Sequence, residues 1–395
     1  MVQGSSDDGV HRTATAPGQR PVTGRALTVV GRTLRGLGLA VGVGGAAGAA
    51  SVLFSDPSPG AERIHWALRV LIILAVSGAG WIVFDASRKV VVRGKQHRAP
   101  VITSFEQLRG ERYILYLRPF AVDTWMSAAP PEAPGFLTRS PFELPGLTTE
   151  EFIVGQFSRH GRVVAVGQPG ERLPLLGAQR GYLPLQGWQH TVSELIQGAH
   201  TVLMSVAPGP GTVWEFTEVL RTIAPERLVL MVGCGSQDYD AFRVAAAAAY
   251  EARKSQEGGS TWAPLPALPD CPVVPRASKQ EWAMPLRAFI TFGQEWEPNL
   301  CRFVVTVPRR RQAWTVRRLV RDQLEPVLGP LSGLPQKRTA ETIPLRTPAG
   351  STDSPPPPAS ASVSAPPQPL LGSVLRPEPV RSRGRRNRAG RPRRK

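Results

Sequence analysis

The sequence predicts an α/β protein with a largely parallel sheet, preceded by a two-helix transmembrane hairpin and followed by a disordered basic tail. Two apolar runs lie near the N-terminus, and short apolar runs then alternate with helical patterns. The last part of the chain is rich in Pro and Arg. The predicted boundaries are a disordered cytoplasmic leader at 1–32, the hairpin at 33–85, a basic juxtamembrane linker at 86–110, the α/β domain at 111–330 and the tail at 331–395.

The first apolar run, residues 36–54, contains no charged residue, and the second, residues 70–84, is the more hydrophobic. Because about 20 apolar residues span a bilayer as a helix, we expect membrane helices at about 34–54 and 66–84. A cleaved signal peptide is the alternative for the first run, but the polar leader before it exceeds the usual length. The Gly38-x-x-x-Gly42 and Gly44-x-x-x-Gly48 spacings allow close helix contact and homo-oligomers, and a bias toward small residues explains them equally well.

Charged residues around the two runs predict their orientation. Five arginines precede the first run and five basic residues follow the second, whereas the loop at 55–65 holds one Arg, one Asp and one Glu. Cytoplasmic flanks carry the excess of basic residues. We therefore expect a plasma-membrane protein with two spans, the lipid bilayer as partner and both termini in the cytoplasm.

The formal charge of +18 is concentrated in the tail, where residues 381–395 contain nine basic residues and no acidic residue. Such a segment buries too little apolar surface to offset its ordering entropy, which predicts disorder. Its candidate partners are anionic lipid or nucleic acid, and a solvated tail without a specific partner is the alternative. No aromatic residue lies among these arginines, so the segment has no aromatic side chain on which a nucleic-acid base could stack.

The cysteine and histidine patterns exclude several site classes. Three widely spaced cysteines rule out a disulfide scaffold and a C-x-x-C site, and six histidines show no metal-ligand spacing. We therefore predict no metal site and no required cofactor.

The α/β domain is predicted from apolar runs at 113–117, 163–166, 201–206 and 228–232, with a further candidate strand at 303–307. The predicted helices are 149–160, with Thr148 or Thr149 as N-cap, and 188–198, 213–223, 239–254 and 312–328. Ligands of parallel sheets sit at the carboxyl ends of the strands, so the loops after 117, 166 and 206 are the expected site. The proline-rich segment 120–145 is either a binding loop or an insertion.

The most informative segment is Pro208-Gly209-Pro210-Gly211-Thr212-Val213-Trp214-Glu215, which follows a strand and opens a helix. Gly209 and Gly211 let the backbone approach a ligand, and a helix N-terminus suits an anion. Thr212 is a candidate to cap the helix or bond a sugar hydroxyl, and Glu215 is placed to face the ligand. The alternative is a capping box, in which Thr212 and Glu215 only satisfy the helix start.

Four further residues are candidates, each with a simpler explanation. Arg118 is a candidate phosphate ligand, and the alternatives are a surface salt bridge or an anchor for the loop that follows it. Asp123 is a candidate partner for ribose hydroxyls or a turn residue. Trp214 is a candidate base-stacking residue or part of the core, and Glu218, three residues after Glu215, is a second-choice carboxylate.

Three stretches of the sequence resemble enzymes that act on N-glycosidic bonds. The run Ile114-Leu115-Tyr116-Leu117-Arg118-Pro119-Phe120 is similar to the first strand of nucleoside 2-deoxyribosyltransferases, and Ile196-Gln197-Gly198-Ala199-His200-Thr201-Val202 resembles their helix-to-strand step. The run from Gly211 to Glu215 resembles their Gly-Thr-x-x-Glu and the related motif of lysine-decarboxylase-like phosphoribohydrolases. Trp214-x-x-x-Glu218 is similar to the Trp-x-x-x-Glu of TIR domains.

The resemblance implies a Rossmann-like fold and a nucleotide or NAD-like ligand, with Glu215, then Glu218, as catalytic carboxylate. Breaking an N-glycosidic bond develops positive charge on the sugar, which a carboxylate can stabilise or attack. The acid that precedes the transferases' Gly-Thr pair is replaced here by Pro208-Gly209, which favours a non-catalytic, membrane-tethered sensor. A scaffold that only docks proteins is the third hypothesis.

Overall fold

The computed structural model describes residues 18–54, 62–131, 148–184, 186–256, 262–271, 280–308 and 315–335. The leader up to residue 17, the tail from residue 336 and the segment 132–147 within the proline-rich loop lie outside the described residues. The predictions of disorder in the leader and tail are therefore not addressed by the structure over those ranges.

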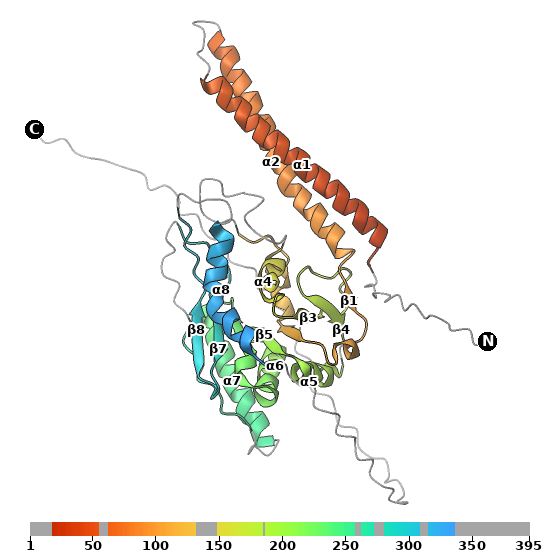
Figure 1. The fold of residues 1–395 in the computed structure, drawn as a ribbon, viewed down its shortest axis with the longest axis vertical. Helices are drawn as coiled ribbons and strands as arrows, with labels where there is room; N and C mark the ends of the chain where they lie inside the picture. Colours follow the sequence, from red (N-terminus) through yellow and green to blue (C-terminus); the bar gives the residue numbers. More distant parts are fainter. Residues whose placement is uncertain are drawn as a thin grey trace, which may run out of the picture. The chain divides into compact units, whose positions relative to one another are not determined.

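An eight-stranded sheet forms the centre of the domain (Figure 1). Its strand order is β1-β4-β3-β2-β5-β6-β7-β8, with β1 to β6 parallel and the last two strands antiparallel. The strands are β1 Val101–Ile102, β2 Tyr113–Leu117, β3 Arg162–Gly167, β4 Gln179–Tyr182, β5 Thr201–Ser205, β6 Leu228–Val232, β7 Ala288–Phe292 and β8 Pro298–Arg302.

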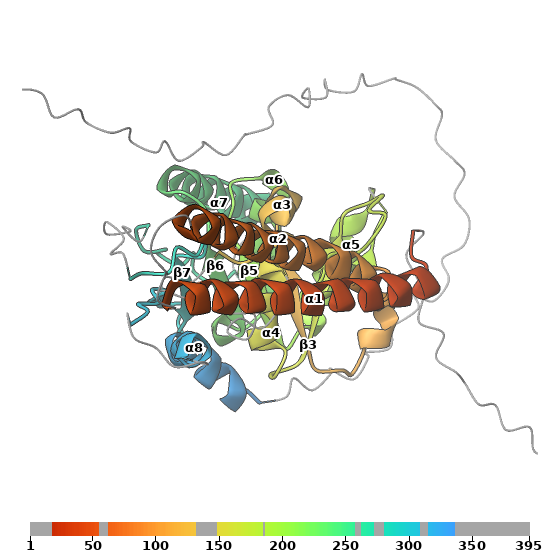
Figure 2. The same ribbon diagram turned by 90° about the horizontal axis from the view of Figure 1, so that it is seen from above.

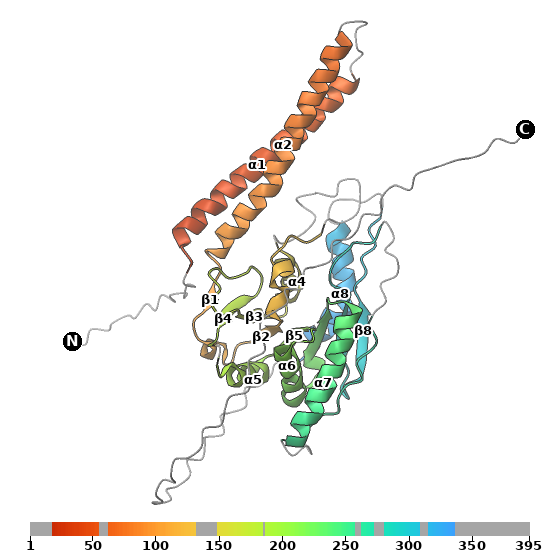
Figure 3. The ribbon, with the colours of Figure 1, turned by 180° about the vertical axis from the view of Figure 1, so that it is seen from behind.

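Helices cover both faces of this sheet (Figures 1 and 3). One apolar core joins the sheet to α5 (Trp188–Gly198), α6 (Pro210–Thr222) and α7 (Ser236–Gln256). The other joins the opposite face to α4 (Thr149–Phe157) and α8 (Thr315–Gly333). Burial on both faces explains why every residue of β2, β5 and β6 is buried and why all of them except Thr201 and Ser205, at the two ends of β5, are apolar or tyrosine. Short helical segments at Phe105–Leu108, Phe120–Val122, Asp123–Met126 (α3) and Pro225–Arg227 complete the order.

The strand order reverses at β2. After β2 the chain adds β3 and β4 on one side, and then returns through α5 to place β5 on the other side. At such a reversal the two outgoing connections diverge and leave a crevice at the carboxyl ends of the strands. The loops after β2 and β5 are therefore brought together at this crevice.

The helices α1 (Pro21–Phe54) and α2 (Glu62–Gln96) lie alongside each other as a hairpin (Figure 2). Small residues line the contact: a Cβ on Gly80 would lie 2.5 Å from the Gly42 nitrogen, and one on Gly38 would lie 2.6 Å from the Phe84 nitrogen. The Ser77 hydroxyl donates a hydrogen bond of 2.7 Å to the Gly42 carbonyl across the contact. The first predicted glycine pair is therefore used within one chain, whereas Gly44 faces open space.

Both helices are long and apolar enough to cross a membrane, over Pro21–Ser51 and Ala67–Gln96. Large apolar side chains point outward from them; Leu71, Ile72, Leu74, Val41 and Val43 are examples. Both helices extend beyond the predicted 34–54 and 66–84, so residues 21–32 and 86–96 are helical rather than leader and linker. The predicted limits followed the apolar runs alone, and these runs end where the helices continue with basic residues.

Four predicted strands match the structure to within one residue at each end, and the candidate strand at 303–307 is wrong. In place of that strand, β7 and β8 pair as an antiparallel ribbon, and Thr306 makes only an isolated bridge to Glu281. Strand β4 contains Gln179, Arg180 and Gly181, which do not form an apolar run, and was not predicted.

We predict that Gly80→Val destabilises the hairpin, because the added side chain meets the backbone of the facing helix. The expected cost is about 1–3 kcal/mol. The matched control is Gly78→Val on the same helix, where a Cβ meets nothing within 4 Å. Detergent-driven unfolding, followed by circular dichroism, measures both. Equal effects of the two substitutions would contradict the described helix contact.

Candidate functional site

A cavity of about 290 Å³ lies where the strand order reverses. Its walls come from the ends of β2 and β3, the loop before α5 and the amino end of α6. One part of the lining is polar: Tyr116, Arg118, Gly209, Gly211, Thr212 and Glu215. The other part is mainly apolar: Leu117, Pro119, Phe120, Val166, Gly167, Pro169, Leu183, Pro184, Trp188 and Val192.

Arg118 directly follows β2, and its side chain is only 1% exposed. One terminal nitrogen of its guanidinium pairs with Asp123, and Nε lies 3.7 Å from Glu150 Oε2. Neither Nε nor Nη2 has a hydrogen-bond partner among the described residues. A buried cation with unused donors is costly to maintain, which makes a ligand group a natural partner. The ion pair of Arg118 is thus buried rather than on the surface, and it joins Arg118 to Asp123 at the start of the proline-rich segment, as the loop-anchor alternative expects.

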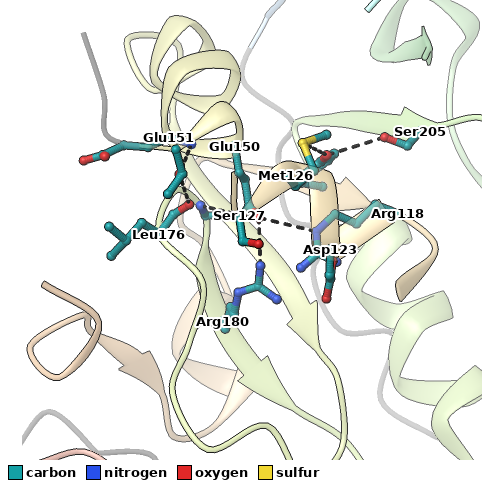
Figure 4. Close-up of polar contacts among 12 residues, drawn as sticks. Arg118, Asp123, Met126, Ser127, Glu150, Glu151, Leu176, Arg180 and Ser205 are labelled. Atoms are coloured by element: carbon teal, nitrogen blue, oxygen red, sulfur yellow. Dashed lines mark hydrogen bonds and ion pairs between the residues drawn. The ribbon is translucent and has the colours of Figure 1, made fainter. Parts of the chain in front are cut away.

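Arg118 belongs to a buried network of charges (Figure 4). Glu150 Oε2 accepts a hydrogen bond of 2.8 Å from Arg180 Nη2, and both side chains are fully buried. The second oxygen of Glu150 accepts from the amide of Ala178 at 3.3 Å. Arg180 Nη1 also lies 3.6 Å from Glu171 Oε2. These contacts fix the position of Glu150, and hence of Arg118, from α4 and β4.

The carboxylates at the edge of the network have shifted pKa values. Burial raises the pKa of Asp123 above its usual range, although the charge of Arg118 acts in the opposite direction. Burial likewise raises the pKa of Glu171, against the attraction of Arg180. Because Asp123 pairs with Arg118 and does not line the cavity, the structure gives no support to its predicted contact with ribose.

The amino end of α6 supplies two backbone donors. Gly209 is the N-cap, with Pro210 at the first helical position, and no side chain caps the helix. The first helical bond runs from the Val213 amide to the Gly209 carbonyl at 3.0 Å. The amides of Gly211 and Thr212 therefore have no partner within the helix, and the helix dipole favours an anion beside them. A Cβ on Gly209 or Gly211 would meet nothing within 4 Å, so the cavity is open at both residues.

Glu215 lines the cavity one turn into α6 and is half-buried. The capping-box alternative is wrong, since the cap is Gly209 and Thr212 makes no capping bond. Within the described residues, no hydrogen bond or ion pair holds the Glu215 carboxyl. Burial raises its pKa to about 8, although Arg118 lowers it. The carboxyl is therefore largely neutral at pH 7 and can donate a hydrogen bond.

Glu218 does not line the cavity. Its carboxylate accepts hydrogen bonds from Arg253 at 2.7 Å, from Arg221 at 2.5 Å and from the Ser193 hydroxyl. Burial acts to raise the pKa of Glu218, but these hydrogen bonds outweigh it and lower the pKa to about 2. The structure thus separates the two predicted catalytic carboxylates into a neutral one in the cavity and an ionised one in a salt-bridge cluster.

Trp214 also lies behind the cavity wall rather than in it. Its ring packs against Trp188 with centroids 5.0 Å apart at 79°, and Trp188 is the residue that lines the cavity. Sequence reasoning missed Trp188, Glu150 and Arg180. The adjacent acids Glu150 and Glu151 in a first helical turn were visible, but nothing in the sequence indicated that Glu150 faces two arginines.

Among the described residues, no group of three or more His, Cys, Asp or Glu side chains is placed to hold a metal ion. Comparisons with protein-family models, with curated proteins and with solved structures found no match.

We predict that Arg180→Met destabilises the domain by about 3–5 kcal/mol, because it leaves Glu150 buried without its main partner. Denaturant unfolding followed by tryptophan fluorescence measures the change. The control is Arg318→Met, which breaks an exposed pair with Asp322 and should have little effect. The double variant Arg180→Met/Glu150→Leu should recover part of the loss. A single variant as stable as the wild type would contradict the network.

We predict that Glu215→Gln stabilises the protein relative to the wild type at alkaline pH. The folded-state pKa of about 8 exceeds the ordinary value, so the stability contribution of the protonated carboxyl is complete at low pH. That contribution disappears as the pH rises through about 8. The difference in melting temperature should therefore grow from about zero near pH 4 to a few degrees at pH 9.

Glu218→Gln is the matched control on the same helix, and its sign is opposite. Its folded-state pKa of about 2 lies below the ordinary value, so its stability contribution is present at neutral pH and disappears on acidification. A pH-independent difference for Glu215→Gln would show that the carboxyl is solvated.

Proposed function

We propose that the protein is a membrane-anchored, Rossmann-like domain that binds a nucleotide or NAD-like ligand in the cavity at the strand reversal. The observation that carries this proposal is the convergence of unused donors on one cavity. Arg118, two of whose guanidinium nitrogens have no hydrogen-bond partner among the described residues, lines the same cavity as Gly211 and Thr212, whose amides have no partner within α6. An anionic group such as a phosphate satisfies all of them.

The rest of the cavity fits the other parts of such a ligand. Apolar side chains beside Trp188 offer a surface for a ring, and Thr212 and Glu215 offer side-chain oxygens for sugar hydroxyls. The resemblance of residues 114–120 and 211–215 to N-glycosidic enzymes adds independent support, because both stretches border this cavity. A ligand with phosphate, sugar and ring therefore suits the lining better than a purely apolar or purely ionic one.

Glu215 is the candidate catalytic residue for cleavage of the N-glycosidic bond. A neutral carboxyl acts as a proton donor to a leaving base, whereas a nucleophile must be ionised. Positive charge developing on the sugar, together with Arg118, would lower the pKa of Glu215 from about 8 and favour ionisation within the complex.

A non-catalytic sensor is the second candidate, and the state of Glu215 favours it. Burial holds this carboxyl largely neutral at pH 7, and the described residues that line the cavity include no second carboxylate. In addition, Pro208-Gly209 stands where the transferases have an acid. Both observations favour ligand binding without turnover.

The membrane part of the proposal rests on the hairpin. Both helices satisfy the length and hydropathy of a membrane span, and their outward faces are apolar. Basic residues flank the spans on the side away from the connecting loop, which supports a plasma-membrane protein with both termini and the cavity in the cytoplasm. The bilayer, a second copy of the chain, and anionic lipid or nucleic acid at the basic tail remain its proposed partners.

We predict that adenosine 5′-monophosphate or NAD raises the melting temperature of the full chain in detergent, and that Gly211→Val weakens binding at least tenfold. The substitution fills open space beside the unused amides without disturbing a packed neighbour. Gly155→Val on α4, where a Cβ also meets nothing within 4 Å outside the cavity, is the matched control.

Measuring the release of free base separates the candidate functions. Release that Glu215→Gln abolishes while binding persists identifies an enzyme, and binding without release identifies a sensor. The absence of both, with every ligand, would contradict the proposed function and leave the protein-docking scaffold.

A further inference from the structure

The apolar wall of the cavity is centred on Trp188, the first residue of α5. Gly187, the N-cap, has φ +71°, a conformation that favours glycine, and it allows the helix to begin directly at the tryptophan. An indole in a half-apolar cavity offers a large rigid surface for a planar ring. The position of this indole is thus set by backbone geometry rather than by a flexible loop.

A chain of contacts supports Trp188 from behind. Trp214 packs edge-on against it, with centroids 5.0 Å apart, and the guanidinium carbon of Arg253 lies 5.5 Å from the Trp214 centroid. Arg253 also lies 5.5 Å from the centroid of Trp262, so its cation is held between two indoles. Its terminal nitrogens donate to Glu218 at 2.7 Å and to the Thr217 hydroxyl at 2.8 Å.

These contacts indicate a role for Glu218, which does not line the cavity. Its side chain is 2% exposed, and its carboxylate pairs with both Arg253 and Arg221. The pair with Arg253 fixes the position of that guanidinium. Burying such a cluster is costly, and a buried charge network commonly serves to specify one arrangement of its neighbours. Here the neighbours are Trp214, which contacts Arg253, and Trp188, which packs against Trp214 and lines the cavity.

The chemistry of the wall indicates how a ring would be recognised. Besides Trp188, the described cavity lining includes five further residues with large apolar or proline side chains: Phe120, Val166, Leu183, Pro184 and Val192. The polar side chains of the lining belong to the ends of β2 and to α6. A wall without polar side chains gains energy from stacking and contact but reads no donor and acceptor pattern on the edge of a base.

We propose that Trp188 is the ring-binding residue of the cavity, that Glu218, Arg253 and Trp214 are positioning residues that hold it, and that the site accepts base rings with little preference between them. This inference rests on the proposed function and specifies its ligand: a nucleotide recognised by contact with its ring and by its anionic group. The base is recognised by its planar ring rather than by its edge.

The test compares three ligands on the full chain in detergent: adenosine 5′-monophosphate, guanosine 5′-monophosphate and ribose 5-phosphate, which lacks a ring. Wild type should bind the two nucleotides with affinities within about threefold and ribose 5-phosphate much more weakly. Trp188→Leu should lose about tenfold or more for both nucleotides and little for ribose 5-phosphate, given the strength of base–aromatic stacking. Trp188→Phe, which retains a ring, should recover most of the affinity.

The positioning role has its own readout. Arg253→Met should reduce the ratio of nucleotide to ribose 5-phosphate affinity, whereas Arg253→Lys, which keeps a cation beside Glu218, should restore it. A merely structural loss would lower binding of all three ligands equally, and that result would overturn the positioning role.

Two outcomes separate this inference from the proposed function. Undiminished nucleotide binding by Trp188→Leu, or a preference between the two bases above about thirtyfold, would overturn the inference while the proposed function stands. Absence of binding of every ligand by the wild type would overturn both.

Discussion

The site depends on how the charge of Arg118 is held at the end of the central strand. Asp123 pairs with one terminal nitrogen of the guanidinium and Glu150 lies near Nε, while Nε and Nη2 have no hydrogen-bond partner among the described residues. Glu150 is in turn fixed by Arg180 and by a backbone amide. The charge is thus compensated enough to be buried, but its hydrogen-bonding capacity is not used up. Such an arrangement is unfavourable for an empty core and favourable for a binding site.

The fold supplies the geometry that makes this arrangement useful. Since the strand order reverses at β2, the connection that carries Arg118 and the helix α6 that follows β5 meet at one crevice. Gly209 and Gly211 line that crevice together with Arg118, and the amides at the start of α6 have no partner within the helix. The same helix presents Glu215 to the cavity and Glu218 to the support of Trp188. Two carboxylates three residues apart therefore have opposite pKa shifts, one at the cavity and one in a cluster of ion pairs.

Much of this was accessible from the sequence, and the exceptions have physical causes. Apolar runs predict strands that are buried on both faces, so β2, β3, β5 and β6 were found, whereas β4, with Arg180 in a buried ion pair, gives no such signal. Gly211 and Glu215 were singled out by local spacing at the start of one helix, and both line the cavity. Trp188, Glu150 and Arg180 act through partners distant in the sequence, and only the folded chain shows those contacts.

The most direct measurement of the central claim is an experimental structure of the full chain with adenosine 5′-monophosphate bound. The account predicts the phosphate within hydrogen-bonding distance of the Arg118 guanidinium and of the amides of Gly211 and Thr212. A nucleotide bound elsewhere, or an Arg118 whose free nitrogens remain directed at protein groups while the cavity stays empty, would contradict it.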